Sequence, residues 1–262
     1  MVPENNIGKK IIFLYPPSWI KEEFIEELVS NEYEAFSLEN HKILFPLLKT
    51  LDSAFLFINI DNGPKENEWE KYISKIQSSP LNEKVTVCVM TNNNAKELVS
   101  KYIGSLKVAG GFIILRQRIA DVRKSIYKVL TTHKAKGRRR FVRAKCNSDN
   151  KATFNAYVDG SLKSGKIRDI SSVGMACHFD DSTIQIKQKQ TIPDIQLRLM
   201  GKIVTVSGIV AGIRQERERI YVILFDPKTA PSVKEKIHSF IKYALDNWIQ
   251  QRIRELSATV SA

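Results

Sequence analysis

Cysteine and histidine are scarce in this chain, and their spacing excludes several classes of site. The three cysteines stand far apart, with neither C-x-x-C nor neighbouring histidines, which argues against a disulfide framework and against zinc: Cys88, Cys146 and Cys177. The four histidines have no serine, cysteine or carboxylate at a spacing typical of a triad or metal site, and no P-loop is present. The sequence therefore predicts no enzyme, no metal site and no cofactor.

Long apolar segments are also missing. No apolar run approaches the roughly 20 residues that a membrane helix needs. The short apolar run 11–14 is followed at once by Pro16 and Pro17, without a small-residue cleavage site, which is unlike a secretory signal. We therefore expect a cytoplasmic protein that does not enter a membrane.

Positive charge is abundant and unevenly distributed. Residues 1–130 hold 17 Lys and Arg against 16 Asp and Glu, whereas residues 131–262 hold 24 against 12. Nearly all of the net charge of +13 therefore belongs to the second half. Its peak is the basic segment, residues 132–145, in which seven Lys and Arg occur without an acid. Such a segment suits an anionic partner, and its like charges repel until an anion arrives.

The first half alternates apolar runs with segments of helical periodicity. The strand candidates are residues 10–15, 33–38, 54–60, 84–90 and 111–115. The helix candidates are residues 19–30, 43–51, 68–77, 95–103 and 119–131. Strands this apolar need cover on both faces, so we expect an α/β domain with a parallel sheet in the flavodoxin-like order 2-1-3-4-5.

That pattern resembles, in outline, a response-regulator receiver domain. Receivers carry two acids after the first strand, where this chain has Tyr15, Pro16 and Pro17. Asn59 falls at the phosphoacceptor position, Thr91 fits the position after the fourth strand, and Leu115 or Arg116 stands where lysine is expected. We expect residues 1–131 to be a receiver-like domain that cannot be phosphorylated in the usual way and that serves interaction or dimerisation. An unrelated α/β domain of this architecture is the alternative.

The second half changes to short alternating stretches. We expect strands over residues 152–157, 163–169, 174–179, 183–186, 195–200, 202–210 and 219–224. Strands at this spacing favour a closed antiparallel barrel. A helix is predicted after Pro231, with one broad apolar face on which Trp248 is expected to pack in the core.

Two motifs frame the start of this half. Arg139 and Arg143 form R-x-x-x-R, and Asp169, Ser171 and Gly174 form D-x-S-x-x-G. Arginine can bond bidentately to guanine O6 and N7 or to phosphate, whereas a carboxylate accepts from the guanine N1 and N2 hydrogens. We expect Gly174 to adopt a positive φ. Taken singly, these residues could also be a solvated face and a common turn.

Together, in this order and spacing, the motifs resemble the signature of PilZ domains, β-barrels that bind cyclic di-GMP. The resemblance implies a PilZ barrel over residues 146–262, with the basic segment (residues 132–145) as its flexible lead-in. It also implies a ligand site made of Arg138, Arg139, Arg143, Asp169, Ser171 and Gly174. Arg138, just ahead of the first motif arginine, implies two stacked ligand molecules per domain.

The implied function is a bacterial cyclic di-GMP receptor whose domains rearrange on binding and signal to an unknown downstream protein, flagellar or regulatory. Three alternatives stay open: a DNA-binding regulator, a protein-interaction regulator using the same basic segment, and a PilZ-like structural protein without ligand. Nucleic acid is disfavoured because Asp169 would repel phosphate and no helix-turn-helix pattern is present.

Overall fold

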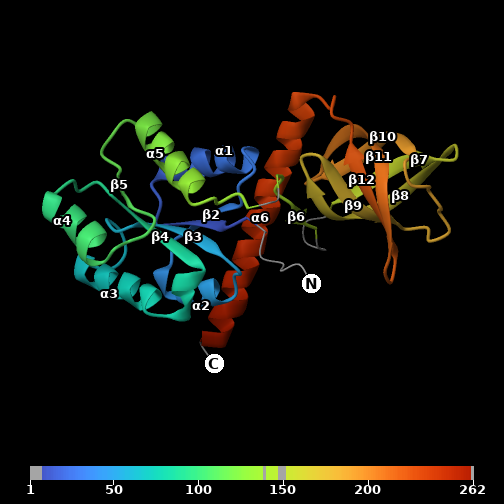
Figure 1. The fold of residues 1–262 in the computed structure, drawn as a ribbon. Coiled ribbons are helices and arrows are strands. Elements are labelled where there is room, and N and C mark those ends of the chain that lie inside the picture. The colour runs from blue at the N-terminus through green and yellow to red at the C-terminus, as the bar shows by residue number, and fades with distance from the viewer. Residues whose placement is uncertain (1–7, 138–139, 147–151, 261–262) are drawn as a thin grey trace. The chain divides into compact units, whose positions relative to one another are not determined.

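The computed structural model describes residues 8–137, 140–146 and 152–260 (Figure 1). The chain forms two compact units, residues 1–140 with 249–262, and residues 141–248. Helix α6 (Pro231–Val260) begins in the second unit and ends in the first. The three domain ranges expected from the sequence stay a prediction.

The first unit is built on a five-stranded parallel sheet with the order β2-β1-β3-β4-β5. Its strands are β1 (Lys10–Leu14), β2 (Ala35–Leu38), β3 (Ala54–Asn59), β4 (Val85–Thr91) and β5 (Phe112–Ile114). Every residue of β3 is buried, as expected for a central strand with cover on both faces. The predicted α/β architecture and strand order are confirmed.

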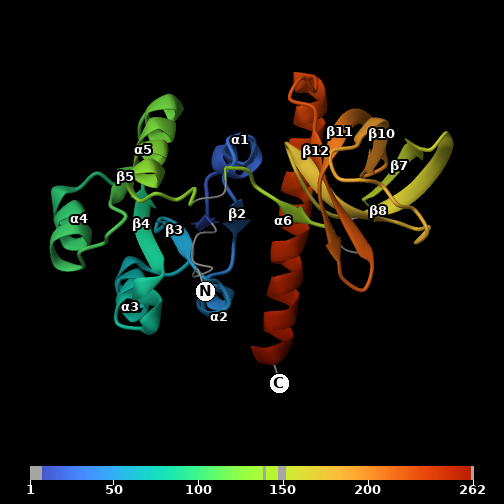
Figure 2. The ribbon, with the colours of Figure 1, turned by 45° about the vertical axis from the view of Figure 1, so that its right-hand side comes forward.

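Helices cover both faces of this sheet, with α1 and α5 on one face and α2 and α3 on the other (Figures 1 and 2). The helices are α1 (Ile25–Ser30), α2 (His41–Lys49), α3 (Glu66–Gln77), α4 (Lys96–Ser100) and α5 (Ile119–Thr132). Two of the predicted helices contain π-helical turns, at Ile20–Phe24 ahead of α1 and at Lys101–Ser105 after α4. Apolar side chains of α1 and α5, among them Leu28 and Ile126, join those of the sheet in one core.

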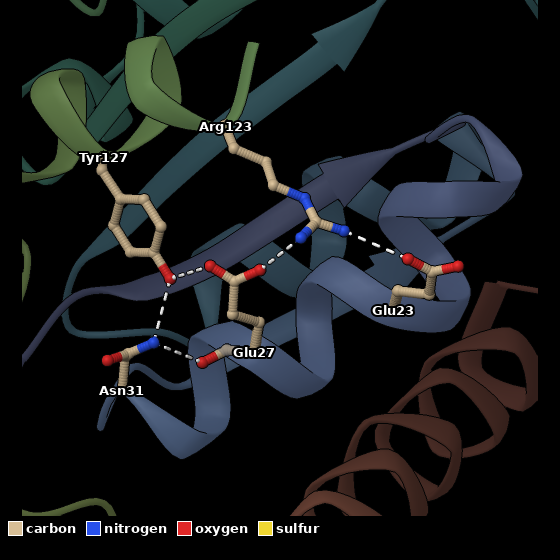
Figure 3. Close-up of polar contacts among 5 residues, drawn as sticks. All are labelled: Glu23, Glu27, Asn31, Arg123 and Tyr127. Carbon is tan, nitrogen blue, oxygen red and sulfur yellow. Dashed lines mark hydrogen bonds and ion pairs between the residues drawn. The ribbon is translucent and has the colours of Figure 1, made fainter. Parts of the chain in front are cut away.

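Polar contacts also join α5 to α1 and to the π-helical turn before it (Figure 3). The Arg123 guanidinium donates through Nη1 to Glu27 Oε2 at 2.8 Å and through Nη2 to Glu23 Oε2 at 3.1 Å. The Tyr127 hydroxyl donates to Glu27 Oε1 at 2.9 Å and accepts from Asn31 Nδ2 at 3.1 Å. Glu27 is therefore held by two groups of α5 at once.

The second unit is a closed antiparallel β-barrel. Its sheet runs in the order β6-β8-β7-β10-β11-β12-β9, and an additional β8–β9 pairing closes a ring of six strands. The strands are β6 (Ala144–Lys145), β7 (Thr153–Val158), β8 (Ser161–Ser171), β9 (Gly174–Phe179), β10 (Thr191–Leu199), β11 (Lys202–Gln215) and β12 (Arg219–Phe225). The β11–β12 hairpin extends beyond the other strands (Figures 1 and 2). The predicted barrel and final helix are confirmed.

One predicted strand is wrong. Residues 183–186 form no strand, although Ile184 and Ile186 are both buried as strand alternation would require. The backbone of this segment is hydrogen-bonded to a side chain and not to a neighbouring strand: the Tyr221 hydroxyl donates to the Ile184 carbonyl at 2.8 Å. Asp181 accepts from the Thr183 backbone N–H at 2.9 Å and so fixes a local turn at its start.

Within the part of the chain that the structure describes, no helix combines the length and apolar character needed to cross a bilayer.

Candidate functional site

The end of the first motif lies beside the second motif on the barrel. Strand β6 pairs antiparallel with β8, with Ala144 opposite Ile170 and Lys145 opposite Asp169. The Cys146 backbone N–H extends this ladder by donating to the Arg168 carbonyl at 2.8 Å. The end of the basic segment is thereby fixed against the strand that carries the second motif.

Arg143 and Asp169 are the two motif residues that this pairing brings together. Arg143 Nη1 lies 3.8 Å from Asp169 Oδ1, and the two side chains are 49% and 27% exposed. The register of β8 against β9 shifts between Ile167 and Asp169, and bulges of this kind re-aim side chains next to functional sites. A cation and an anion thus stand side by side, each still accessible to a ligand.

Three other predicted site residues are Arg138, Arg139 and Ser171. Arg138 and Arg139 lie outside the described residues. Ser171 is buried, and its hydroxyl donates to the Gly174 carbonyl at 3.2 Å across the β8–β9 turn. This bond holds the turn next to Asp169.

The conformation predicted for Gly174 is wrong. Its φ is not positive, and Gly174 is the first residue of β9, opposite Ser171 and Leu224. A Cβ atom at this position would lie 2.5 Å from the Ile223 carbonyl oxygen. Gly174 is therefore required by the close approach of β12, and its motif position serves the closure of the barrel.

A cavity of about 460 Å³ opens beside Asp169, and we call it the candidate cavity. Its volume lies within the usual range for ligand pockets, roughly 300–1,000 Å³. It is lined by Lys145, Cys146, Arg168, Asp169, Ala176, Arg214, Ile220, Ala244 and Trp248. Three cations, one carboxylate and an indole ring thus surround a small apolar floor, which suits an anionic aromatic ligand.

The site predicted from the sequence did not include the two arginines and the tryptophan of this cavity. Arg168 directly precedes Asp169, so its place in the motif strand was a usable signal. Arg214 comes from β11, and only the barrel closure brings it to this cavity. Trp248, expected to pack in the core, is only partly buried and lines the cavity.

The cavity thiol is not activated. Burial raises the pKa of Cys146 to about 12, and the neighbouring Asp169 carboxylate adds to the rise. Burial, and then Asp169, also raise the pKa of Cys177, which lies on β9. Because the thiolate is the reactive species, these cysteines line the barrel as inert groups at neutral pH.

A second polar cluster lies at the carboxyl edge of the parallel sheet, where the receiver resemblance places its acids. Asn59 Nδ2 donates to the Tyr15 carbonyl at 2.9 Å. Asp61 accepts from the Thr91 hydroxyl and, at 2.7 Å each, from the backbone N–H and the Nδ2 of Asn92. Both Asp61 oxygens are thus engaged within the edge itself. No group of three potential metal ligands occurs among residues 8–137, 140–146 and 152–260.

Comparison with known proteins gave likenesses in fold only. No family model and no curated protein matches the chain. The second-messenger-bound PilZ domain of YcgR from Escherichia coli is 15% identical, with a TM-score of 0.37, over 44% of this chain and 96% of that domain. MrkH of K. pneumonia in complex with c-di-GMP is 16% identical, with a TM-score of 0.34, over 45% of this chain and 55% of MrkH.

A likeness to a receiver domain was found as well. The signal receiver domain of a histidine kinase from Clostridium thermocellum is 21% identical, with a TM-score of 0.38, over 47% of this chain and 97% of that domain. Each of these likenesses extends over less than half of this chain.

Proposed function

We propose that this chain is a cyclic di-GMP receptor and that the ligand binds in the candidate cavity. The observation that carries the proposal is the 3.8 Å approach of Arg143 to Asp169, because it unites two motifs that are separate in the sequence. Cyclic di-GMP carries phosphates, which need fixed cations, and guanines, which need an acceptor for N1–H and N2–H.

Residues of the two motifs and of the cavity wall share the roles in this proposal. Arg143, with Arg138 and Arg139 ahead of it, supplies guanidinium groups to phosphate and to guanine O6 and N7. Asp169 accepts from the guanine N1 and N2 hydrogens and so selects guanine over adenine. Trp248 offers a flat surface for a base, while Ser171 and Gly174 hold the β8–β9 turn in place.

The proposed output is a change of conformation and not a chemical reaction. Ligand phosphates neutralise the basic segment (residues 132–145), and this alters the arrangement of the two units and hence the surface offered to a downstream protein. We propose a cytoplasmic receptor with a flagellar or regulatory partner.

Titration calorimetry of the full chain tests the binding step. Cyclic di-GMP should bind with two molecules per chain, whereas GTP, cyclic di-AMP and duplex DNA should bind far more weakly. Arg139→Ala should lose about 30-fold or more in affinity, since removing one partner of a desolvated charge pair costs about 2 kcal/mol or more. Arg116→Ala, at an exposed position of the first unit, is the matched control. Wild-type affinity in Arg139→Ala, or no binding by the wild-type chain, would refute the proposal.

A further inference from the structure

The tip of the β11–β12 hairpin is tied back to the barrel by two acidic residues. The Arg168 guanidinium of β8 donates to the Glu216 carboxylate through Nη1. His178 Nδ1 of β9 lies 3.2 Å from Glu218 Oε2, a contact that becomes an ion pair when the imidazole is protonated. The Glu216 carboxylate at the hairpin tip therefore lies next to Arg168, the residue that directly precedes the second motif.

Arg168 borders two cavities. It lines the candidate cavity together with Asp169, and it also lines a neighbouring cavity of about 1,040 Å³. The hairpin tip forms one wall of this larger cavity through Glu216 and Glu218, while Lys166 and Arg198 belong to the barrel side. Glu216, which pairs with Arg168, lines the larger cavity and is not among the residues that line the candidate cavity.

The pair is exposed enough to exchange partners. The Arg168 side chain is 51% exposed and that of Glu216 is 42% exposed. An ion pair of this kind contributes little to stability, because water screens the attraction and two long side chains lose rotamer freedom. Arginine binds carboxylate and phosphate in the same bidentate manner, so a phosphodiester can take the place of the carboxylate without leaving the guanidinium unpaired.

The hairpin tip has a second contact with the barrel, from Glu218 to His178, that does not involve Arg168. Glu216 also lies in a cavity wall that holds Lys166 and Arg198, two other cations near its carboxylate. Resting on the proposed function, we propose that Arg168 is a further phosphate-binding residue of the site and that Glu216 competes with the ligand for it. The hairpin tip is then a built-in competitor that sets the affinity.

The test is a double-mutant cycle on the full chain with cyclic di-GMP as the titrant. Glu216→Gln should tighten binding by about two- to fivefold, since the ligand no longer displaces a carboxylate. Arg168→Gln should weaken binding by about tenfold or more. In the Arg168→Gln background, Glu216→Gln should have no further effect on affinity, because the guanidinium for which Glu216 and the ligand compete is gone.

Glu235→Gln, at an exposed position of α6 in the same unit, removes the same charge away from Arg168 and is the matched control. An equal gain in Glu216→Gln and Glu235→Gln would mean a general charge effect and would overturn the inference. So would wild-type affinity in Glu216→Gln or in Arg168→Gln. Absence of binding by the wild-type chain is a different outcome and contradicts the proposed function itself.

Discussion

Arg143 Nη1 lies 3.8 Å from Asp169 Oδ1, across the short ladder formed by β6 and β8. At this distance the two charges attract each other without a close hydrogen bond. Each is partly exposed, so a ligand that offers a phosphate to the arginine and a guanine edge to the aspartate can separate them at small cost. The relationship makes Asp169 the residue whose change should report most directly on guanine recognition.

Asp169→Asn should weaken cyclic di-GMP binding by about tenfold or more, because a good pair of hydrogen bonds to a base contributes about 1–3 kcal/mol to discrimination. The asparagine amide would present a donor to the guanine N1 and N2 donors. Titration calorimetry with cyclic di-GMP and with its inosine analogue, which lacks N2, measures both effects. The variant should discriminate less between the two ligands.

The control for this change is Asp159→Asn, in the exposed turn between β7 and β8. It removes the same charge from the barrel at a position where asparagine tolerates the positive φ of 49°. Equal losses in both variants would assign the effect to net charge and not to recognition of the base.

Gly174→Ala should destabilise the barrel by about 1–3 kcal/mol, the usual cost of overpacking. The added methyl group would lie 2.5 Å from the Ile223 carbonyl oxygen and would push β9 away from β12. Hydrogen exchange of the β9 and β12 amides measures the opening of this ladder. Gly212→Ala, where nothing lies within 4 Å of the new atom, should leave the exchange unchanged. Similar protection in both variants would contradict the packing argument.

Cys146 should react with iodoacetamide at least about a hundredfold more slowly than free cysteine at pH 8, because a pKa near 12 leaves very little thiolate. The rate should rise as the pH is raised toward that pKa. Mass spectrometry of peptides from the labelled native chain gives the rate, and the urea-unfolded chain provides the reference. Labelling of native Cys146 at the reference rate would show that burial does not control this thiol.

The architecture of both units could be predicted from the sequence because it depends on local apolar patterns. Strand β3 is buried along its whole length, and its sequence is correspondingly apolar from Ala54 to Ile58. The same rule fails for residues 183–186, where Ile184 and Ile186 alternate like a strand but the backbone bonds to Tyr221. Periodicity reports which side chains are buried and not what the backbone contacts.

The site could be predicted only in part because it depends on register between distant segments. Strand β6 has two residues, too few for any periodic signal, yet its pairing brings Arg143 to Asp169. Trp248 has the helical spacing of a core residue, and the broad apolar face of α6 does not distinguish a core position from a cavity wall. The positive φ predicted for Gly174 is wrong, because this glycine is required by a tertiary contact, the approach of β12, that local sequence does not reveal.

The contacts drawn in Figure 3 predict that Arg123 has a larger coupling energy with Glu27 than with Glu23. Arg123 pairs with Glu27, whose side chain is 34% exposed, and with Glu23, whose side chain is 72% exposed. A double-mutant cycle between Arg123→Ala and Glu27→Ala should give a coupling of about 0.5–1 kcal/mol, and the cycle with Glu23→Ala should give close to zero. A cycle is needed because Arg123 also lies over the rings of Trp19 and Phe24, at 5.8 and 5.5 Å from their centroids.

Hydrogen exchange of the α1 and α5 amides gives the local free energy of opening for each variant. The Glu23 cycle is the matched control, since it uses the same arginine and the same substitution. Roughly 0.5 M salt should abolish any coupling between Arg123 and Glu23 and should leave most of the coupling between Arg123 and Glu27, because salt screens exposed charges most strongly. Equal couplings at low salt would contradict the assignment of Glu27 as the residue that fixes α5 on α1.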